Sequence, residues 1–268
     1  MISVEILTIG NEILLGLVED TNSNYLCRVV RGMGGRVRHI AVVRDEIDAI
    51  ADEIRMSVER GADLIFTCGG LGPTDDDLTL AALAKAANLR LETNETAKQL
   101  VERRYRKLAL QGYVSSAEMS EARLKMARLP EDARPVENPV GAAPAVVLES
   151  GGARIVSLPG VPAELRGIVE GPLQSLLTEV FGRGSYRERQ ITVECGDESE
   201  LAPALRKVTA AHPEVYIKSR ASHFGSDVRF RILVSASGAS AEETEQMIES
   251  AAADLIRMLG DAGIKEQS

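Results

Sequence analysis

The sequence predicts an α/β protein in which a three-layer, doubly wound and mostly parallel sheet is followed by a second, small α+β domain. Three observations support this fold class. Strand-like and helix-like runs alternate over residues 1–90, and the last part of the chain has the order strand, helix, strand, strand, helix. The length of 268 residues lies between one large domain and two ordinary ones, and 44% apolar residues are enough to bury a core.

The first part of the chain alternates between buried strands and amphipathic helices. Ile47, Ile50, Ile54 and Val58 recur at helical spacing, and Gly61 ends that element. Because strands separated by helices of this length form βαβ units, we expect a parallel sheet with helices on both faces. The predicted strands here are residues 3–10, 36–43 and 63–68, and the predicted helices are residues 22–34, 47–60 and 77–87.

The middle of the chain is less regular. Gly171 and Pro172 are expected to break the helical segment 163–181. Glycines and charges interrupt the apolar pattern in FGRGSYRER (181–189), so we predict domains at residues 1–182 and 185–268. The other predicted elements are the helices 95–110, 117–127, 198–210 and 241–259, a loop and strand over 135–150, and the strands 153–162, 189–195, 214–218 and 228–235.

Charge and composition argue against several classes of partner. The 40 acidic residues exceed the 31 basic ones, and residues 185–268 carry 14 acidic against 10 basic side chains. This balance provides no basic surface for nucleic acid or an anionic membrane. No apolar run approaches the roughly 20 residues of a membrane span. Cys27, Cys68 and Cys195 form no CxxC pair, so we expect reduced thiols and a cytoplasmic protein.

The loop GGLGPTDDD, residues 69–77, follows the third predicted strand. In an open parallel sheet, ligands bind beyond the carboxyl ends of the strands. Gly69, Gly70 and Gly72 let backbone N–H groups approach a ligand, and Pro73 stiffens the turn. The loop lacks the third glycine of GxGxxG, and the chain has no P-loop motif, so neither common nucleotide signature is present.

Acidic residues gather in the loops at the same edge of the predicted sheet. A helix starting near Asp76 would favour phosphate through its N-terminal partial charge, or Asp75 and Asp76 would simply cap that helix. Three uses of the acids are open: capping and solvation, recognition of ligand hydroxyl or amino groups, and binding of a Mg²⁺-type metal. A divalent cation would remove the repulsion between phosphate and carboxylates. The acids are Glu12, Asp45, Asp75, Asp76 and Asp77.

Five motifs, GNEILLG, DTNSN, GGLGPTDDDLT, NPVG and LPGVP, resemble in this order the CinA family. The N-terminal domain of that family is similar to the molybdopterin-binding domains of MogA, MoaB and MoeA. The resemblance covers about the first 175 residues, and the segment from about residue 185 resembles the KH-like middle domain of CinA proteins. Many CinA proteins continue into a deamidase domain that acts on nicotinamide mononucleotide. This chain stops before it, so that activity is not expected.

The resemblance implies a site for a nucleotide or pterin phosphate, and a metal-dependent ADP-ribose pyrophosphatase that yields AMP and ribose 5-phosphate. Its metal would be a divalent ion of the Mg, Mn or Co type. Asp77 and Asp45 match two acidic residues of MogA-type domains, and Glu12 matches the acid of the G-D/N-E motif. Asp77, Asp76 and Glu12 are the expected catalytic and metal-binding residues. The expected ligand-binding residues are Gly10, Asn11, Asn22, Asn24, Asp45, Gly69, Gly70, Leu71, Gly72, Pro73, Thr74, Thr79, Asn138, Gly141, Pro159 and Gly160.

Two alternatives to the hydrolase remain open at this point. The first is a protein of molybdenum cofactor synthesis that binds molybdopterin or transfers an adenylyl group to it. The second is a binding module without catalysis that partners a separately encoded deamidase. Asn11 and Ala145 replace an aspartate and a glycine that are usual in the family, which favours the second alternative. All three hypotheses need the same phosphate-binding loop, and we expect a homodimer in each case.

Overall fold

The computed structural model describes residues 1–182, 184–221, 229–238 and 240–267. The chain divides into two compact units, the first of Met1–Val30 with Arg36–Gly182 and the second of Arg31–Gly35 with Arg183–Ser268. Arg183 of the predicted boundary segment and the first residue of the predicted strand 228–235 lie outside the described residues. Within the described ranges, every helix is too short or too polar to span a bilayer.

The first unit is built on a six-stranded sheet in the order β2-β1-β3-β8-β7-β6. β1 pairs in parallel with β2 and β3, and β3 pairs in parallel with β8. β7 runs antiparallel to both of its neighbours. The predicted mostly parallel sheet is therefore confirmed. The strands are β1 (Ser3–Ile9), β2 (Arg36–Val43), β3 (Leu64–Cys68), β6 (Arg134–Val136), β7 (Ala145–Ser150) and β8 (Ala153–Leu158).

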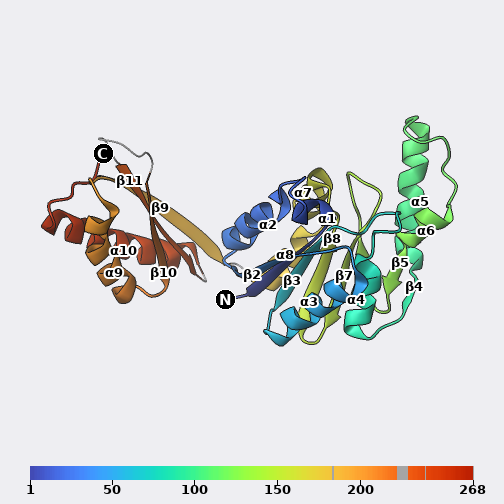
Figure 1. Cartoon of the computed structure of the whole chain (residues 1–268), viewed down its shortest axis with the longest axis horizontal. Helices are drawn as coiled ribbons and strands as arrows, with labels where there is room; N and C mark the ends of the chain where they lie inside the picture. The colour runs from blue at the N-terminus through green and yellow to red at the C-terminus, as the bar shows by residue number, and fades with distance from the viewer. Residues whose placement is uncertain (183, 222–228, 239, 268) are drawn as a thin grey trace. The chain divides into compact units, whose positions relative to one another are not determined.

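Helices cover both faces of this sheet (Figure 1). On one face, Ile54 and Leu83 share a buried cluster with Ile65 of β3. Phe66 is also fully buried, and because successive strand side chains point to opposite faces, it packs under the helices of the other face. The three predicted layers are thus confirmed. The helices of the first face are α3 (Ile47–Glu59) and α4 (Thr79–Ala87), and those of the second are α2 (Thr21–Gly32), α7 (Pro162–Val169) and α8 (Gln174–Phe181).

The middle of the chain holds shorter elements than the sequence predicts. The predicted helix 117–127 is only α6 (Glu121–Lys125), because the Ser120 side chain accepts a hydrogen bond from the Arg123 N–H and starts the helix there. The prediction missed β4 (Leu91–Thr93) and β5 (Arg128–Pro130), which form a two-stranded antiparallel sheet. Strands of three residues are too short for an alternating pattern to be recognised. The predicted helix 95–110 is confirmed as α5 (Glu95–Leu110).

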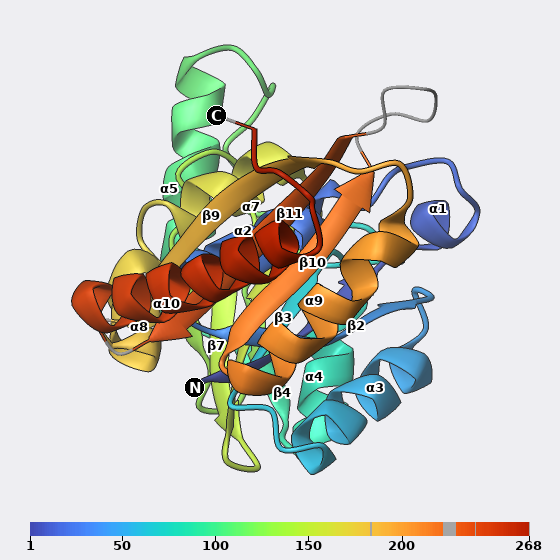
Figure 2. The same ribbon diagram turned by 90° about the vertical axis from the view of Figure 1, so that its left-hand side faces the viewer.

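The second unit has a three-stranded antiparallel sheet in the order β10-β11-β9. Figure 2 shows α9 and α10 side by side over one face of this sheet. Their Leu201 and Leu255 are fully buried in a cluster with Ile191 and Ile232 of the strands. The order of elements is the predicted one, and the likeness to KH domains stays a prediction. The elements are β9 (Ser185–Glu194), α9 (Glu198–Ala211), β10 (Val215–Ala221), β11 (Arg229–Gly238) and α10 (Ala241–Asp261).

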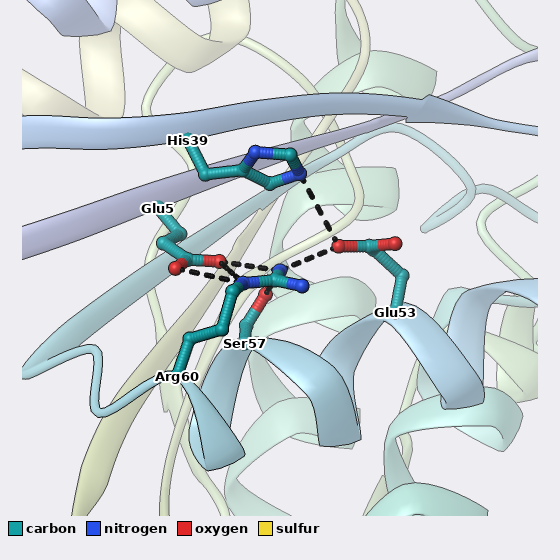
Figure 3. Close-up of polar contacts among 5 residues, drawn as sticks. All are labelled: Glu5, His39, Glu53, Ser57 and Arg60. Atoms are coloured by element: carbon teal, nitrogen blue, oxygen red, sulfur yellow. Dashed lines mark hydrogen bonds and ion pairs between the residues drawn. The ribbon is translucent and has the colours of Figure 1, made fainter.

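A partly buried ion cluster, with Glu5 at its buried end, lies in the first unit near the amino end of β1 (Figure 3). Arg60, which follows α3, donates hydrogen bonds to Glu5 at 2.6 and 3.0 Å and to Glu53 at 2.6 Å. Burial by itself raises the pKa of Glu5, but the hydrogen bonds from Arg60 and Ser57 outweigh this and hold the pKa below its usual value. His39 Nε2 lies 3.6 Å from Glu53. Every acid of this cluster therefore faces a basic side chain.

Candidate functional site

A cavity of about 570 Å³, here called the first cavity, lies at the carboxyl ends of β1, β3 and β8. Thr8 and Ile9 of β1, Cys68 of β3 and Pro159 after β8 all line it. Ligands of open parallel sheets bind at this edge. The volume falls within the roughly 300–1,000 Å³ that is typical of ligand pockets. The first cavity is therefore the candidate functional site of the first unit.

The first cavity brings together residues that lie far apart in the sequence. Most of the predicted site residues line it, including residues 69–73, here called the glycine loop, and the three acids expected to be catalytic. Their placement agrees with a shared site, although their chemical roles remain predictions. The predicted residues that line the first cavity are Glu12, Asn22, Asp45, Gly69, Gly70, Leu71, Gly72, Pro73, Asp76, Asp77, Pro159 and Gly160.

The other predicted residues lie outside the lining. Asn24 is exposed on α2. Thr79 is fully buried at the start of α4, and its Oγ donates to the Gly69 carbonyl oxygen at 2.7 Å, so it braces the glycine loop from behind. The remaining members of this group, which support the loops around the cavity, are Gly10, Asn11, Thr74, Asn138 and Gly141.

The glycine loop is fixed by two backbone hydrogen bonds, whereas several of its N–H groups make none to the described part of the protein. The Gly69 N–H donates to the Leu158 carbonyl at 2.9 Å, and the Thr79 N–H donates to the Gly70 carbonyl at 3.1 Å. Gly69 has φ +108°, and a Cβ there would overlap the Ile9 carbonyl oxygen, so only glycine fits. In the described part of the chain, the N–H groups of residues 70–72 donate to no protein acceptor. These three donors are available to an anionic ligand.

The aspartates after the glycine loop close a turn and do not cap a helix. The Asp77 carboxylate accepts hydrogen bonds from the Thr74 N–H at 2.9 Å and the Thr74 Oγ at 2.7 Å. α4 begins only at Thr79, and its N-cap residue, Leu78, provides no side-chain acceptor. The expectation of a helix start near Asp76, with Asp75 or Asp76 as its cap, is therefore wrong. The reason is that the side chain of Asp77 satisfies the backbone of the turn before the helix can start.

The same turn fixes the second predicted catalytic aspartate. Asp76 accepts a hydrogen bond from the Thr74 Oγ at 2.5 Å. This bond, together with a backbone hydrogen bond and the nearby Lys125 charge, lowers the pKa of Asp76. Asp76 is therefore a carboxylate at neutral pH. It lies one residue from Asp77, so both can face a ligand that reaches the glycine loop.

The loops after β1 and β2 are tied to one another beside the cavity. The N–H of Asn11, the first residue of α1 (Asn11–Leu14), donates to Asp45 at 2.8 Å. Asp45 therefore serves first as an acceptor that fixes α1. Among the described residues, its other carboxylate oxygen accepts no hydrogen bond and can face a ligand. Glu12 follows Asn11 and is exposed at the cavity, where no protein group holds its side chain among the described residues.

A single asparagine organises the NPVG loop. The Asn138 side-chain oxygen accepts from the N–H groups of Val140 and Gly141, at 3.0 and 2.7 Å. Its amide nitrogen donates to the Ala143 carbonyl at 2.9 Å and to Glu164 at 2.7 Å. A Cβ at position 141 would overlap the Glu164 carboxylate. Asn138 and Gly141 therefore position Glu164, and their predicted contact with a ligand stays a prediction.

The sequence analysis missed three acids of the first cavity, Glu19, Asp20 and Glu164, and the last two are held by contacts to other elements. Glu164 lies in the first turn of α7, two residues after the proline of LPGVP. Asp20 accepts hydrogen bonds from the Ser23 N–H and the Thr8 Oγ, each at 2.9 Å, and thereby links the start of α2 to the end of β1. Both lie inside or beside the quoted motifs LPGVP and DTNSN. The sequence signal that could have identified them is an acidic residue within or next to a motif that follows a predicted strand.

The charge of the first cavity is strongly one-sided. Among the described residues, its lining contains no lysine, arginine or histidine. A phosphate would meet neutral donors and the repulsion of these acids, with no positive charge from the lining, unless a cation accompanied it. The carboxylates of the lining are Glu12, Glu19, Asp20, Asp45, Asp76, Asp77 and Glu164.

The carboxylates suit a hard divalent cation, but they do not form a closed cage. Within the described ranges, no three His, Cys, Asp or Glu side chains converge tightly enough to hold a metal by themselves. Mg²⁺ is commonly held by one or two carboxylates together with water and substrate phosphates. Asp77 and Asp76 fit that open arrangement, with Glu12 at the same cavity. The donor set therefore fits a cation that is shared with a phosphate ligand.

Comparisons with known proteins agree with the fold. Residues 5–179 match the family described as "Probable molybdopterin binding domain". A protein of Caldivirga maquilingensis is 42% identical over 253 residues, which cover 94% of each chain. The solved structure of protein CinA from Thermoplasma acidophilum, described as of unknown function, has 34% identity and a TM-score of 0.59 and covers 65% of this chain and 98% of that one. The solved structure of the molybdopterin biosynthesis enzyme MoaB from Thermus thermophilus has 24% identity and a TM-score of 0.46. It covers 68% of this chain and 98% of that one.

Proposed function

The chain belongs to the family of molybdopterin-binding domains matched over residues 5–179. From the lining of the first cavity we propose that it hydrolyses a nucleoside diphosphate sugar. The proposed substrate is ADP-ribose, and the products are AMP and ribose 5-phosphate. The reaction breaks one P–O bond of the pyrophosphate and adds the elements of water across it. The first cavity is the proposed site of this reaction.

One observation carries the proposal: among the described residues, backbone N–H groups without a protein acceptor and carboxylates without a basic residue beside them in the lining belong to the same cavity. The N–H groups of residues 70–72 suit phosphoryl oxygens, whereas seven carboxylates without a basic side chain repel them. A pyrophosphate with a divalent cation satisfies both sets of groups. The carboxylates that are left over accept hydrogen bonds from sugar hydroxyls, which a nucleoside diphosphate sugar supplies.

We assign the side chains of the first cavity the following roles in this reaction. Asp77 and Asp76 would hold the cation, whose chemistry is to neutralise the pyrophosphate and lower the pKa of water. Thr74 keeps both aspartates in place, because its N–H donates to Asp77 and its single hydroxyl proton lies between Asp76 and Asp77. Glu12, exposed at the cavity, would accept the proton of the attacking water. The N–H groups of the glycine loop would donate to the phosphoryl oxygens as negative charge develops on them.

The test is to incubate the full chain with ADP-ribose and Mg²⁺, Mn²⁺ or Co²⁺ and to measure AMP by chromatography. Asp77→Asn should lower the rate at least about 100-fold, the usual effect of removing one essential electrostatic group. Asp52→Asn is the matched control, because Asp52 is exposed on α3, pairs with Arg55 and lines no part of the first cavity. It should keep the wild-type rate. The absence of AMP above a boiled control with every metal would overturn the hydrolase proposal.

The family match itself favours a second candidate function. A protein that binds molybdopterin, or transfers an adenylyl group to it, would also use the glycine loop and the acids of the first cavity. This function predicts binding of molybdopterin by calorimetry and an adenylated product when ATP is added. Binding of a nucleotide without turnover of either substrate would instead support a non-catalytic module.

A further inference from the structure

A second cavity, of about 400 Å³, borders the same glycine loop. Residues 70–73 and Asp77 line both cavities, so this loop forms a wall that the two cavities share. The rest of the second cavity comes from the start of α4, from β4 and β5, and from α6. Of these elements, β4 and β5 are the short strands that the sequence did not reveal. A ligand that reaches over the glycine loop would therefore touch both cavities.

The second cavity differs from the first in its chemistry. Its lining includes two basic side chains, Lys125 of α6 and Arg128 of β5, where the first cavity has none. Apolar side chains also form one wall of the second cavity, next to these two cations. The apolar residues of this wall are Leu78, Leu80, Ala81, Leu91 and Ala122.

The two basic side chains are engaged differently. Lys125 Nζ contacts the main-chain oxygen of Thr74, so its charge faces the turn that follows the glycine loop. Arg128 pairs with Glu121, and both side chains are exposed by about two fifths or more, at 42% and 75%. An exposed pair of this kind is weak and is readily exchanged for a better anion. Both cations are therefore available to a phosphate at the loop.

We propose that the second cavity is a subsite for a nucleoside monophosphate, with the base against the apolar wall and the phosphate between Lys125, Arg128 and the glycine loop. This inference rests on the proposed function in assigning the two halves of one substrate. The AMP half of ADP-ribose lies in the second cavity, and the hydroxyl-rich ribose 5-phosphate half lies among the carboxylates of the first. The pyrophosphate crosses the loop, where Asp77 borders both cavities.

The experiment is isothermal titration of the full chain with AMP and, separately, with adenosine. Lys125→Met and Arg128→Gln should each weaken AMP binding about tenfold, since each removes a charge-assisted hydrogen bond, and should change adenosine binding little. Lys125→Arg keeps the charge and should keep the affinity within about threefold of wild type. Lys107→Met is the matched control, because Lys107 is exposed on α5 and lines neither cavity.

A variant that is expected to tighten AMP binding, rather than weaken it, provides a further test. Glu121 lines the second cavity and competes for Arg128, so Glu121→Gln should tighten AMP binding severalfold. A melting curve of each variant identifies any that fails to fold, and the Arg128 and Glu121 variants leave the Lys125 contact intact. The proposal is overturned if wild type does not bind AMP at millimolar concentration, or if Lys125→Met and Arg128→Gln both bind it as wild type does.

The outcome for this subsite is separable from that of the hydrolase. If AMP binds with the predicted variant pattern but ADP-ribose is not cleaved, the subsite stands and the proposed reaction fails. If ADP-ribose is cleaved but the Lys125 and Arg128 variants bind AMP normally, the reaction stands and the subsite fails.

Discussion

Two acidic regions of the first unit differ in burial and in whether basic side chains lie among their acids. Near the amino end of β1, Glu5 and Glu53 share the guanidinium of Arg60. At the carboxyl ends of the strands, seven carboxylates line the first cavity without a basic residue among its described lining. A buried acid that serves the fold is paired within the protein, because an unpaired buried charge is costly. Acids that remain unpaired at a cavity are candidates for binding something from outside.

The largest effect on stability is expected from breaking the paired region. Arg60→Met removes the partner of Glu5, whose side chain is only 4% exposed. Leaving a buried charge without its partner should lower the free energy of unfolding by about 3 kcal/mol at pH 7. Denaturant unfolding measures this value. The double variant Glu5→Gln/Arg60→Met should lose less than the single one, and equal losses would show that the pair is not what stabilises this region.

A slightly smaller change in the free energy of unfolding is expected when a cation and an anionic ligand together bind at the acidic first cavity. A divalent cation with a methylene analogue of ADP-ribose, which cannot be hydrolysed, should stabilise the protein by about 2.7 kcal/mol when the ligand is at 100 times its dissociation constant. Neither the cation nor the analogue alone should match this effect, because each leaves one charge uncompensated. Thermal unfolding with and without a chelator measures it. Equal stabilisation of Asp77→Asn would contradict the assignment of Asp77 to this site.

The paired region should also respond to acid. The pKa of Glu5 is lowered in the folded protein, so its contribution to stability is fully present above the pKa of an unfolded glutamate, 4.5, and is lost as the pH falls through the folded value. Unfolding curves from pH 7 downwards should therefore show wild type losing stability below about pH 4.5. The double variant Glu5→Gln/Arg60→Met should lose less over the same range. Parallel curves for the two proteins would argue against this linkage.

The smallest effect is expected from neutralising an unpaired acid. Glu12 is exposed and its side chain has no protein partner among the described residues, so Glu12→Gln should change the free energy of unfolding by no more than about 0.5 kcal/mol. The same variant should reduce hydrolysis of ADP-ribose, which an assay at saturating metal measures. A large loss of stability would place Glu12 with the structural acids and remove the distinction between the two regions.

The sequence predicted the regular part of the fold because long apolar periods specify it. The strands and helices of the sheet appear where their patterns indicate, as Ile54 and Ile65 of the buried cluster illustrate. The start of α4 was misplaced because a side chain, that of Asp77, captures the Thr74 backbone, and no periodicity reports such a contact. Local helix propensity therefore predicts the wrong helix start at the turn that borders both cavities.

The candidate site was predictable where the chemistry is concentrated in one segment, and less so where it is dispersed. The glycine loop and its aspartates stand out in the sequence, and the structure places most of them at one cavity. Glu164 and Asp20 reach that cavity only because Asn138 and Thr8, from other loops and strands, hold them there. The second cavity depends on strands of three residues, which leave no readable pattern.

The Asn138 side chain, whose oxygen and nitrogen are both hydrogen-bonded, also affects the resistance of the protein to deamidation. Asparagine deamidates when the backbone nitrogen of the next residue attacks the side-chain amide, and that nitrogen must lose a hydrogen to do so. The next residue here is Pro139, whose nitrogen carries none. Conversion to aspartate at position 138 would set a second carboxylate against Glu164, now 2.7 Å away. The proline therefore protects the NPVG loop against a slow chemical change that would push Glu164 out of place.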